Sequence, residues 1–223
     1  MYTLYFGNKN YSSWSLRPWL LMQHFGIGFE AHQVQVSGRG AHDGHRGYSA
    51  NGLVPCLHVG DFQIWDTLAI AEFLAERHPG LWPDDEFTRA RARSVSCEMH
   101  SGFGALRGAM PMNIKLRLKG VPLNAEVQAD VDRVAAIWTE ARTDFAGDRG
   151  PWLFGDFSIA DAMFAPVVWR FHTYNVALPL VAAAYRDAML AHPAMRAWEA
   201  DALAETIALP SYDAVGEAWG GPR

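Results

Sequence analysis

Leu53-Val54-Pro55-Cys56-Leu57 is the stretch of sequence from which the fold of the N-terminal part follows. An apolar run begins directly after Pro55, and Gly60-Asp61 then predicts a hairpin that joins strands at 56–59 and 62–65. Proline has no N–H to donate to a sheet, so Pro55 suits the first residue of a strand. The stretch alone fits an ordinary trans proline or a cis Val54–Pro55 bond, since cis costs only about 0.5–1 kcal/mol before proline.

The residues before and after this hairpin predict a small mixed sheet. We expect strands at 2–6 and 29–36, and helices at 13–25 and 67–78. A helix joins the first two strands, which should therefore be parallel with a right-handed crossover. The hairpin adds two antiparallel strands, giving a four-stranded sheet with helices packed on it.

The second half of the chain has a different pattern. Residues 79–86 are rich in proline, glycine and acidic residues and predict a linker between domains 1–78 and 87–223. Helical patterns follow at 87–118, 124–147, 159–173, 181–191 and 194–204. No strand pattern interrupts them, so the second domain is expected to be all-α, with a break near Ala109–Met110 because of Pro111.

Composition excludes several classes of function. The chain has 223 residues, a net charge of −5 and a pI near 6.0, which argues against nucleic acid as a partner. Cys56 and Cys97 form neither a metal-binding pattern nor a disulfide framework, so a cytoplasmic protein is expected. We find no signal-peptide pattern and no apolar run of the roughly 18 residues that a membrane span requires.

Three helix starts carry hydroxyl or carboxyl side chains. Ser12 and Ser13 precede the first helix, where they can cap it or donate a hydrogen bond to an anion at its N-terminus. Asp66-Thr67 can likewise cap the next helix, or hold a carboxylate while Asp66 faces an ammonium group. Ser158 and Asp161 have the spacing of a capping box, which we interpret as structural.

Two further groups have both structural and functional interpretations. The apolar stripe at Phe103, Leu106 and Met110 is typical of a core but can also line an apolar pocket. His42 and His45 lie in a glycine-rich loop and, without a third ligand, do not predict a metal site.

These features in order resemble the cytosolic glutathione S-transferase family. Gly52-Leu53-Val54-Pro55, then Asp66-Thr67, then the box from Ser158 to Asp161 follow the family pattern over nearly the whole chain. The resemblance implies a thioredoxin-like N-terminal domain, an all-α C-terminal domain and a cis Val54–Pro55 bond. The stretch Tyr11-Ser12-Ser13-Trp14-Ser15-Leu16-Arg17 is similar to the serine-type classes, zeta and theta.

The resemblance also implies an activity and a set of site residues. Glutathione would be the cosubstrate, its thiolate stabilised by Ser12 and then conjugated to a small hydrophobic electrophile. Glutathione-binding residues would be Leu53, Val54, Pro55, Asp66, Thr67 and Ser13. The electrophile pocket would contain Phe103, Leu106, Met110, Trp169 and Phe171. A homodimer without a metal is expected, as in the family generally.

Departures from the family pattern leave alternatives open. Trp14 stands where zeta members have a cysteine, which disfavours the zeta-type isomerisation of maleylacetoacetate. Leu53 stands where many members bind the glycyl carboxylate with lysine or glutamine, so Arg39, His42 or His45 would have to bind it. A non-catalytic ligand-binding protein is one alternative. A glutathione-dependent reductase or isomerase that uses Ser13, Ser15 or Cys56 is another.

Overall fold

The predicted mixed sheet is present in the structure, a computed structural model that describes residues 1–38, 40 and 42–222. The strand order is β2-β1-β3-β4, in which β1 (Tyr2–Phe6) runs parallel to β2 (Phe29–Gln33) and antiparallel to β3 (Cys56–Val59). The hairpin pairs β3 with β4 (Phe62–Trp65). β2 is shorter than the predicted 29–36, because the Val36 N–H donates to the side chain of Asn8 at 2.7 Å instead of extending the ladder.

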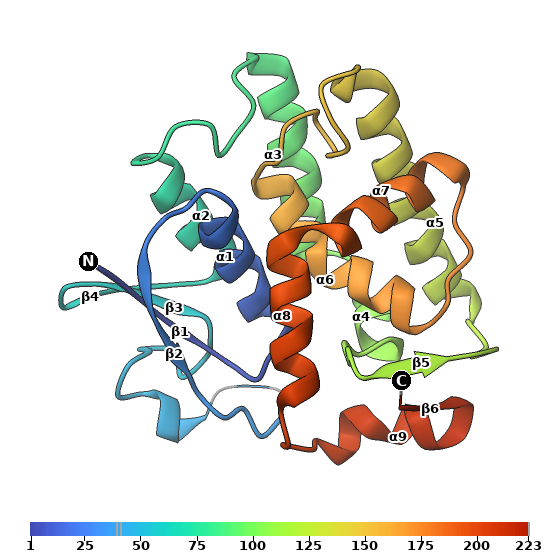
Figure 1. Ribbon diagram of the computed structural model, residues 1–223, viewed down its shortest axis with the longest axis horizontal. Coiled ribbons are helices and arrows are strands. Elements are labelled where there is room, and N and C mark those ends of the chain that lie inside the picture. Colours follow the sequence, from blue (N-terminus) through green and yellow to red (C-terminus); the bar gives the residue numbers. More distant parts are fainter. Residues whose placement is uncertain (39, 41, 223) are drawn as a thin grey trace.

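Helices α1 (Ser13–His24) and α2 (Thr67–Ala75) pack side by side against this sheet (Figure 1). Both end slightly earlier than predicted. On β1 the side chains alternate, with Leu4 and Phe6 buried in the core. Tyr5 stacks on Tyr48 at a centroid distance of 4.6 Å, so the loop around the short 3-10 turn Asp43–His45 covers part of the sheet.

The C-terminal part is mainly helical and differs from the prediction at three places. Its helices are α3 (Glu86–Ser101), α4 (Gly104–Ala109), α5 (Ala125–Glu140) with a π-helical turn at Ala141–Ala146, α6 (Ile159–Thr173), α7 (Leu180–Ala191), α8 (Pro193–Ala204) and α9 (Pro210–Trp219). The pattern at 87–118 is two helices and a strand rather than one helix, and α9 was not predicted. Two short strands, β5 (Leu116–Leu118) and β6 (Gly220–Pro222), pair across the region, so it is not purely α.

The break between α3 and α4 has a local cause, whereas the strand β5 depends on a distant segment of the chain. Gly102 ends α3, and Phe103 then adopts a left-handed conformation (φ 60°) that turns the chain into α4. α4 ends at Ala109, as Pro111 predicts. β5 is stabilised by β6, which is about a hundred residues further along the chain and so leaves no local periodic pattern.

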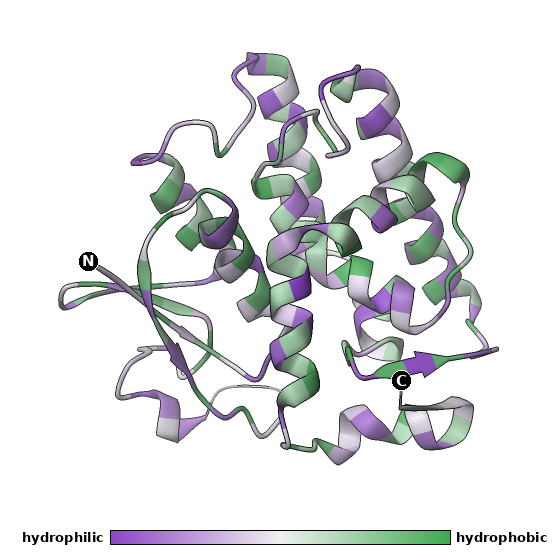
Figure 2. Cartoon of the chain, viewed as in Figure 1, coloured by the Kyte–Doolittle hydropathy of each residue, from purple (hydrophilic) through white to green (hydrophobic). Residues whose placement is uncertain are grey.

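Helix α6 forms the centre of the C-terminal region, between α1 and α3. Nearly every side chain of α6 is buried. Figure 2 shows that outer helices such as α5 and α8 instead carry hydrophobic and hydrophilic residues in alternation. The Asp161 carboxylate accepts from Leu153 N–H and Ser158 N–H, both at 2.9 Å, and completes the predicted capping box. Burial raises the pKa of Asp161 to about 6, although the hydrogen bonds lower it.

A pair of histidines joins the N-terminal region to α8. Nδ1 of His24, at the end of α1, lies 2.8 Å from Nε2 of His192. His192 Nδ1 accepts from Ala194 N–H at 3.1 Å, so the neutral ring carries its proton on Nε2 and donates it to His24. Burial lowers the pKa of both imidazoles, that of His192 to about 4, where the charge of His24 contributes as well.

Among the described residues, no helix combines the length and apolar character that crossing a bilayer requires.

Candidate active site

A cavity of about 740 Å³ lies between the ends of the sheet elements and the helices of the C-terminal region. Its described lining residues are Tyr11, Ser12, Ser13, Trp14, Val36, Gly38, Gly40, His42, His45, Asn51, Leu53, Val54, Pro55, Trp65, Asp66, Thr67, Arg107, Pro111, Arg170, Leu209 and Tyr212. The seven residues expected to carry catalysis and glutathione binding (Ser12, Ser13, Leu53, Val54, Pro55, Asp66 and Thr67) are all in this set.

Ser12 lies in the loop between β1 and α1. It occupies the N-cap position of α1, but its side chain makes no capping hydrogen bond. The Ser12 hydroxyl donates to Ser15 Oγ at 2.7 Å, and the buried Ser15 oxygen also accepts from Gly7 N–H at 2.9 Å. A side chain at Gly7 would come within 2.9 Å of the Ser12 oxygen, so the loop requires glycine there. Ser12 is therefore the N-cap residue by position, as predicted for Ser12 or Ser13, but its hydroxyl does not cap the helix.

The second part of the cavity wall is the start of β3. The Val54–Pro55 peptide bond is cis, as the family resemblance implies. Pro55 is buried, Val54 is partly exposed, and the preceding Leu53 side chain is 40% exposed. These residues lie in the same cavity as Ser12.

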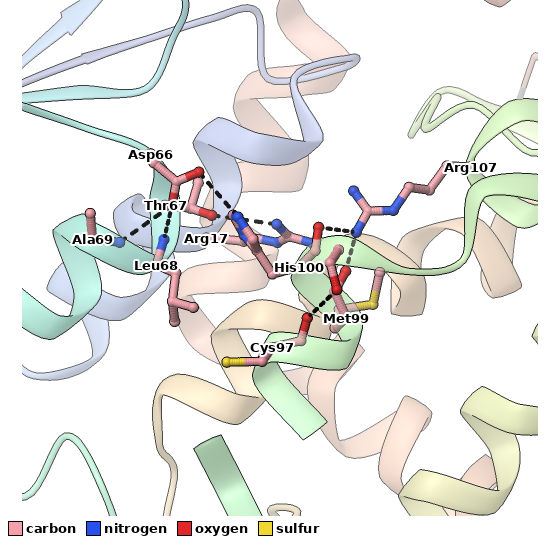
Figure 3. A network of polar contacts seen from close by, with 10 residues as sticks. Arg17, Asp66, Thr67, Leu68, Ala69, Cys97, Met99, His100 and Arg107 are labelled. Carbon is pink, nitrogen blue, oxygen red and sulfur yellow. Dashed lines mark hydrogen bonds and ion pairs between the residues drawn. The ribbon is translucent and has the colours of Figure 1, made fainter. Parts of the chain in front are cut away.

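The third part of this wall is the start of α2, which Figure 3 shows. Asp66 has a positive φ of 74°, and its Oδ1 accepts from Leu68 N–H at 2.9 Å and from Ala69 N–H at 3.4 Å. The capping interpretation of Asp66 is thus confirmed. The other carboxylate oxygen forms an ion pair with Nε2 of His100 from α3 at 3.2 Å. Asp66 therefore caps a helix and contacts His100 at once.

A buried arginine, Arg17, lies beneath the start of α2. Arg17 donates to the Thr67 hydroxyl at 3.4 Å and to the Met163 carbonyl at 3.0 Å. Burial lowers the pKa of Arg17 well below its usual value, and the positive charges of Arg107 and Arg170 lower it further, while Asp66 raises it. The guanidinium groups are thus close enough to repel one another.

The structure corrects the predicted electrophile pocket. The five residues proposed for it, Phe103, Leu106, Met110, Trp169 and Phe171, are buried in the hydrophobic core and do not line the cavity. Their sequence neighbours Arg107 and Arg170 line it instead. Trp169 and Arg170 are both buried on α6, and the arginine reaches the cavity beside Ser13.

Sequence reasoning also missed residues that frame the helical side of the cavity. Tyr11 donates from its hydroxyl to both oxygens of Asp213 at 3.0 Å, which ties α9 to the loop before Ser12. Asn113 donates to the same carboxylate at 2.7 Å. The contacts of Asp213 position α9 so that Tyr212 and the preceding Leu209 line the cavity. An arginine inside an apolar helical run, as at 169–171, is the one sequence signal that would have pointed to a functional position here.

Two of the three residues considered for binding the glycyl carboxylate can be located in the structure. His42 and His45 line the cavity, and His45 is buried. Arg39 lies outside the described residues. Cys56 is fully buried and burial raises the pKa of its thiol, which disfavours a thiolate nucleophile at this position. Among the described residues no three His, Cys, Asp or Glu side chains are grouped so as to hold a metal ion.

The fold and the cavity define a thioredoxin-like domain joined to a helical domain, with a site between them. Two family models match the sequence: the N-terminal domain of glutathione S-transferase at residues 11–77 and its C-terminal domain at residues 124–201. The chain therefore belongs to the glutathione S-transferase family, and the expected class of enzyme, a glutathione transferase, follows from this membership.

Solved structures show the same fold at low sequence identity. A glutathione transferase homologue from Burkholderia gl BGR1, with bound glutathione, is 22% identical with a TM-score of 0.69, covering 92% of this chain and 99% of that one. The theta class enzyme from Xanthomonas axonopodis pv. citri, also with glutathione bound, is 20% identical (TM-score 0.63; 93% and 98%). Human glutathione S-transferase T1-1 is 18% identical (TM-score 0.66; 98% and 97%). No curated protein matches the sequence.

Proposed function

We propose that the protein conjugates the thiolate of glutathione to a small electrophile, with Ser12 activating the sulfur. The observation that carries this proposal is the Ser12 hydroxyl, which lies on the cavity wall without capping its helix and contacts the buried Ser15. Membership of the glutathione S-transferase family supports it. The glutathione bound in the Burkholderia and Xanthomonas structures supports glutathione as cosubstrate.

Glutathione would bind along the wall formed by the starts of α1, β3 and α2. Its cysteinyl backbone would pair with the backbone of Val54, beside Pro55, Leu53 and Ser13. Thr67 would hold the γ-glutamyl carboxylate, and Asp66 would face the ammonium group. The glycyl carboxylate would lie near His42 and His45, both of which line the cavity.

The Ser12 hydroxyl can be freed for the sulfur by a rotation. A hydroxyl both donates and accepts, and Ser15 Oγ already accepts from Gly7 N–H. When the proton of Ser15 turns toward Ser12, the proton of Ser12 can point at the glutathione sulfur. A hydrogen bond to the charged form lowers the pKa of a thiol, which is about 8.5 in a free cysteine. The thiolate fraction at neutral pH then rises.

The chemical step is a substitution with balanced charge. The thiol proton passes to solvent, and the sulfur lone pair forms a bond to an electrophilic carbon. The electron pair of the bond that breaks leaves with the departing group, for example chloride from an aryl chloride. Holding both reactants in one cavity supplies part of the rate enhancement through proximity.

We also propose a cytoplasmic homodimer, as the family resemblance implies. Phe62 on β4 and Phe87 at the start of α3 are large apolar side chains that are 68% and 74% exposed. A partner subunit that covers them would explain their exposure. Sedimentation equilibrium of the purified protein would test the dimer.

A steady-state assay with glutathione and 1-chloro-2,4-dinitrobenzene tests the proposed function. Ser12→Ala should lower kcat/KM about 100-fold, the usual effect of removing one donor that stabilises a developing anion. Glutathione binding by titration calorimetry should change less than about threefold. Ser94→Ala is the matched control, since Ser94 is an exposed serine of α3 that donates only to the Ala90 carbonyl. Unchanged turnover in Ser12→Ala, or glutathione binding without turnover in the wild type, would contradict the proposal.

A further inference from the structure

The helical side of the cavity is cationic where an apolar pocket was expected. Arg107 projects from α4 and Arg170 from α6, and both line the cavity. The only carboxylate among the described lining residues is Asp66. Its two oxygens are already engaged by the amides of Leu68 and Ala69 and by His100. The described lining therefore holds two guanidinium groups, one from α4 and one from α6, against a single carboxylate.

Arg170 is held rigidly beside the proposed catalytic serine. Only 7% of the residue is exposed. It donates to the Met110 carbonyl and, at 3.3 Å, to the Ser13 hydroxyl. These contacts hold the positive charge of Arg170 next to Ser13, the residue that follows Ser12. A guanidinium presents its donors in a planar fork that matches a carboxylate.

Arg107 is held over an aromatic ring of the same cavity. Its guanidinium lies 4.9 Å from the ring of Trp14, and it donates to the Met99 and His100 carbonyls, as Figure 3 shows. Burial lowers the pKa of Arg107, while the negative charge of Asp130 on α5 raises it. Arg17 lies on Trp14 as well, at 4.3 Å. An anion in the cavity would offset the mutual repulsion of these arginines.

Arg17 and Arg170 lie near the proposed positions of two different anionic groups. The arginine that contacts Thr67, where the γ-glutamyl carboxylate is proposed to bind, is Arg17. Arg170 instead contacts Ser13, close to where the sulfur would lie, and shares the cavity with Pro111 and Tyr212. A group that binds Arg170 therefore belongs to whatever approaches the sulfur.

We propose that the second substrate is an anionic electrophile, whose carboxylate or sulfonate is bound by Arg107 and Arg170 while its apolar part packs on Trp14 and Tyr212. This inference rests on the proposed function, because it assigns a substrate class to the same cavity. It differs from the small hydrophobic electrophile that the family resemblance implied.

Equilibrium binding of two reaction products that differ by one charge tests the inference. The probes are the glutathione conjugates of 4-chloro-3,5-dinitrobenzoate and of its methyl ester, measured by titration calorimetry with the intact protein. The carboxylate conjugate should bind at least about tenfold more tightly, since two charge-assisted hydrogen bonds are gained. The preference should decrease as salt is raised.

Variants decide whether the two arginines are responsible. Arg107→Gln and Arg170→Gln should each reduce the preference for the carboxylate conjugate at least about threefold, while the ester conjugate binds as before. Arg107→Lys should retain part of the preference, because it keeps the charge. Arg196→Gln is the control, since it removes an equally charged but exposed side chain from α8. Circular dichroism would show that the partly exposed Arg107 variants fold, even if the buried Arg170 variant does not.

Equal binding of the two conjugates would overturn the inference, as would equal losses for both in the arginine variants. Glutathione binding, measured in the same series, separates this inference from the proposed function. If glutathione binds but the conjugates are not distinguished, only the anionic electrophile is wrong. If glutathione does not bind at all, both proposals fail.

Discussion

The two sides of the cavity are built from different kinds of structure. On the sheet side, the functional candidates lie where elements begin: Ser12 before α1, Pro55 before β3 and Asp66 before α2. On the helical side, the lining residues lie on the faces of helices, as Arg107 and Arg170 do. Starts of elements are marked by proline and capping residues in the local sequence, whereas the orientation of a helix face is decided by distant packing partners. The first side could therefore be predicted and the second could not.

This difference predicts how variants should behave on each side. On the sheet side, substitutions of cavity-lining side chains should change binding or catalysis more than stability, except at Asp66, which caps α2. Substitutions that disturb the packing of α6 should mainly lower the free energy of unfolding, because α6 is buried almost completely. The following predictions test this contrast, in decreasing order of expected effect.

Asp161→Ala should have the largest effect on stability. It removes the acceptor for the N–H groups of Leu153 and Ser158 and abolishes the capping box at the start of α6. Leaving these buried donors without a partner should lower the free energy of unfolding by roughly 2–4 kcal/mol. Urea denaturation measures this, with Asp132→Ala on the exposed side of α5 as the control, for which we expect less than about 0.5 kcal/mol. Similar losses in the two variants would contradict the role of the box.

The histidine contact between α1 and α8 should make stability depend on pH. Burial lowers the folded-state pKa of His192 to about 4, so as pH falls below about 6.5 the unfolded chain binds the proton first and stability is lost. Between pH 7.5 and pH 5 the loss should be about 1–2 kcal/mol relative to His192→Asn. Asparagine can still cap α8 but does not titrate.

The comparison with a variant is needed because Asp161 acts in the opposite direction. Its folded-state pKa is raised to about 6, so its protonation favours the folded state as pH falls from about 6 toward its unfolded value near 4. Subtracting the urea-denaturation curves of wild type and His192→Asn at each pH removes this contribution. A difference that stays constant with pH would show that the His24–His192 contact is not the cause.

Thr67→Val should show the smallest effect, chiefly on binding. If Thr67 holds the γ-glutamyl carboxylate, loss of its hydroxyl should raise KM for glutathione about tenfold with little change in kcat. The shape of the buried side chain is preserved, so the stability should fall only by about 1 kcal/mol, for the acceptor that Arg17 loses. Thr139→Val on α5 is the matched control, since the Thr139 hydroxyl donates to the Ala135 carbonyl away from the cavity. An equal fall in kcat would assign Thr67 to the chemical step instead.

The same contrast explains which helices and strands could be predicted from the sequence. The order of strands and helices up to α2 and the span of α6 at 159–173 were predicted correctly, because proline, glycine and capping residues mark their ends. The break after Ala109 was predicted from Pro111. The β5–β6 pair was missed because its strands are far apart in sequence and three residues long.

The errors at the site have a common physical origin. Leu106 and Arg107, and likewise Trp169 and Arg170, are adjacent, so a helical pattern places one of each pair in the core and turns the other away from it. Assigning the apolar member to the pocket assumed a hydrophobic cavity. Tyr11 gave no signal at all, because its partner Asp213 lies on α9, which local patterns did not predict.

The activation of sulfur by Ser12 is the central claim, and a spectroscopic titration tests it most directly. The ultraviolet absorbance of the thiolate of bound glutathione would be followed against pH in wild type and in Ser12→Ala. We predict that the thiolate forms at least about one pH unit below the titration of a free thiol in the wild type, and that the midpoint moves back upward in Ser12→Ala. Identical midpoints in the two proteins, with glutathione bound in both, would contradict the account.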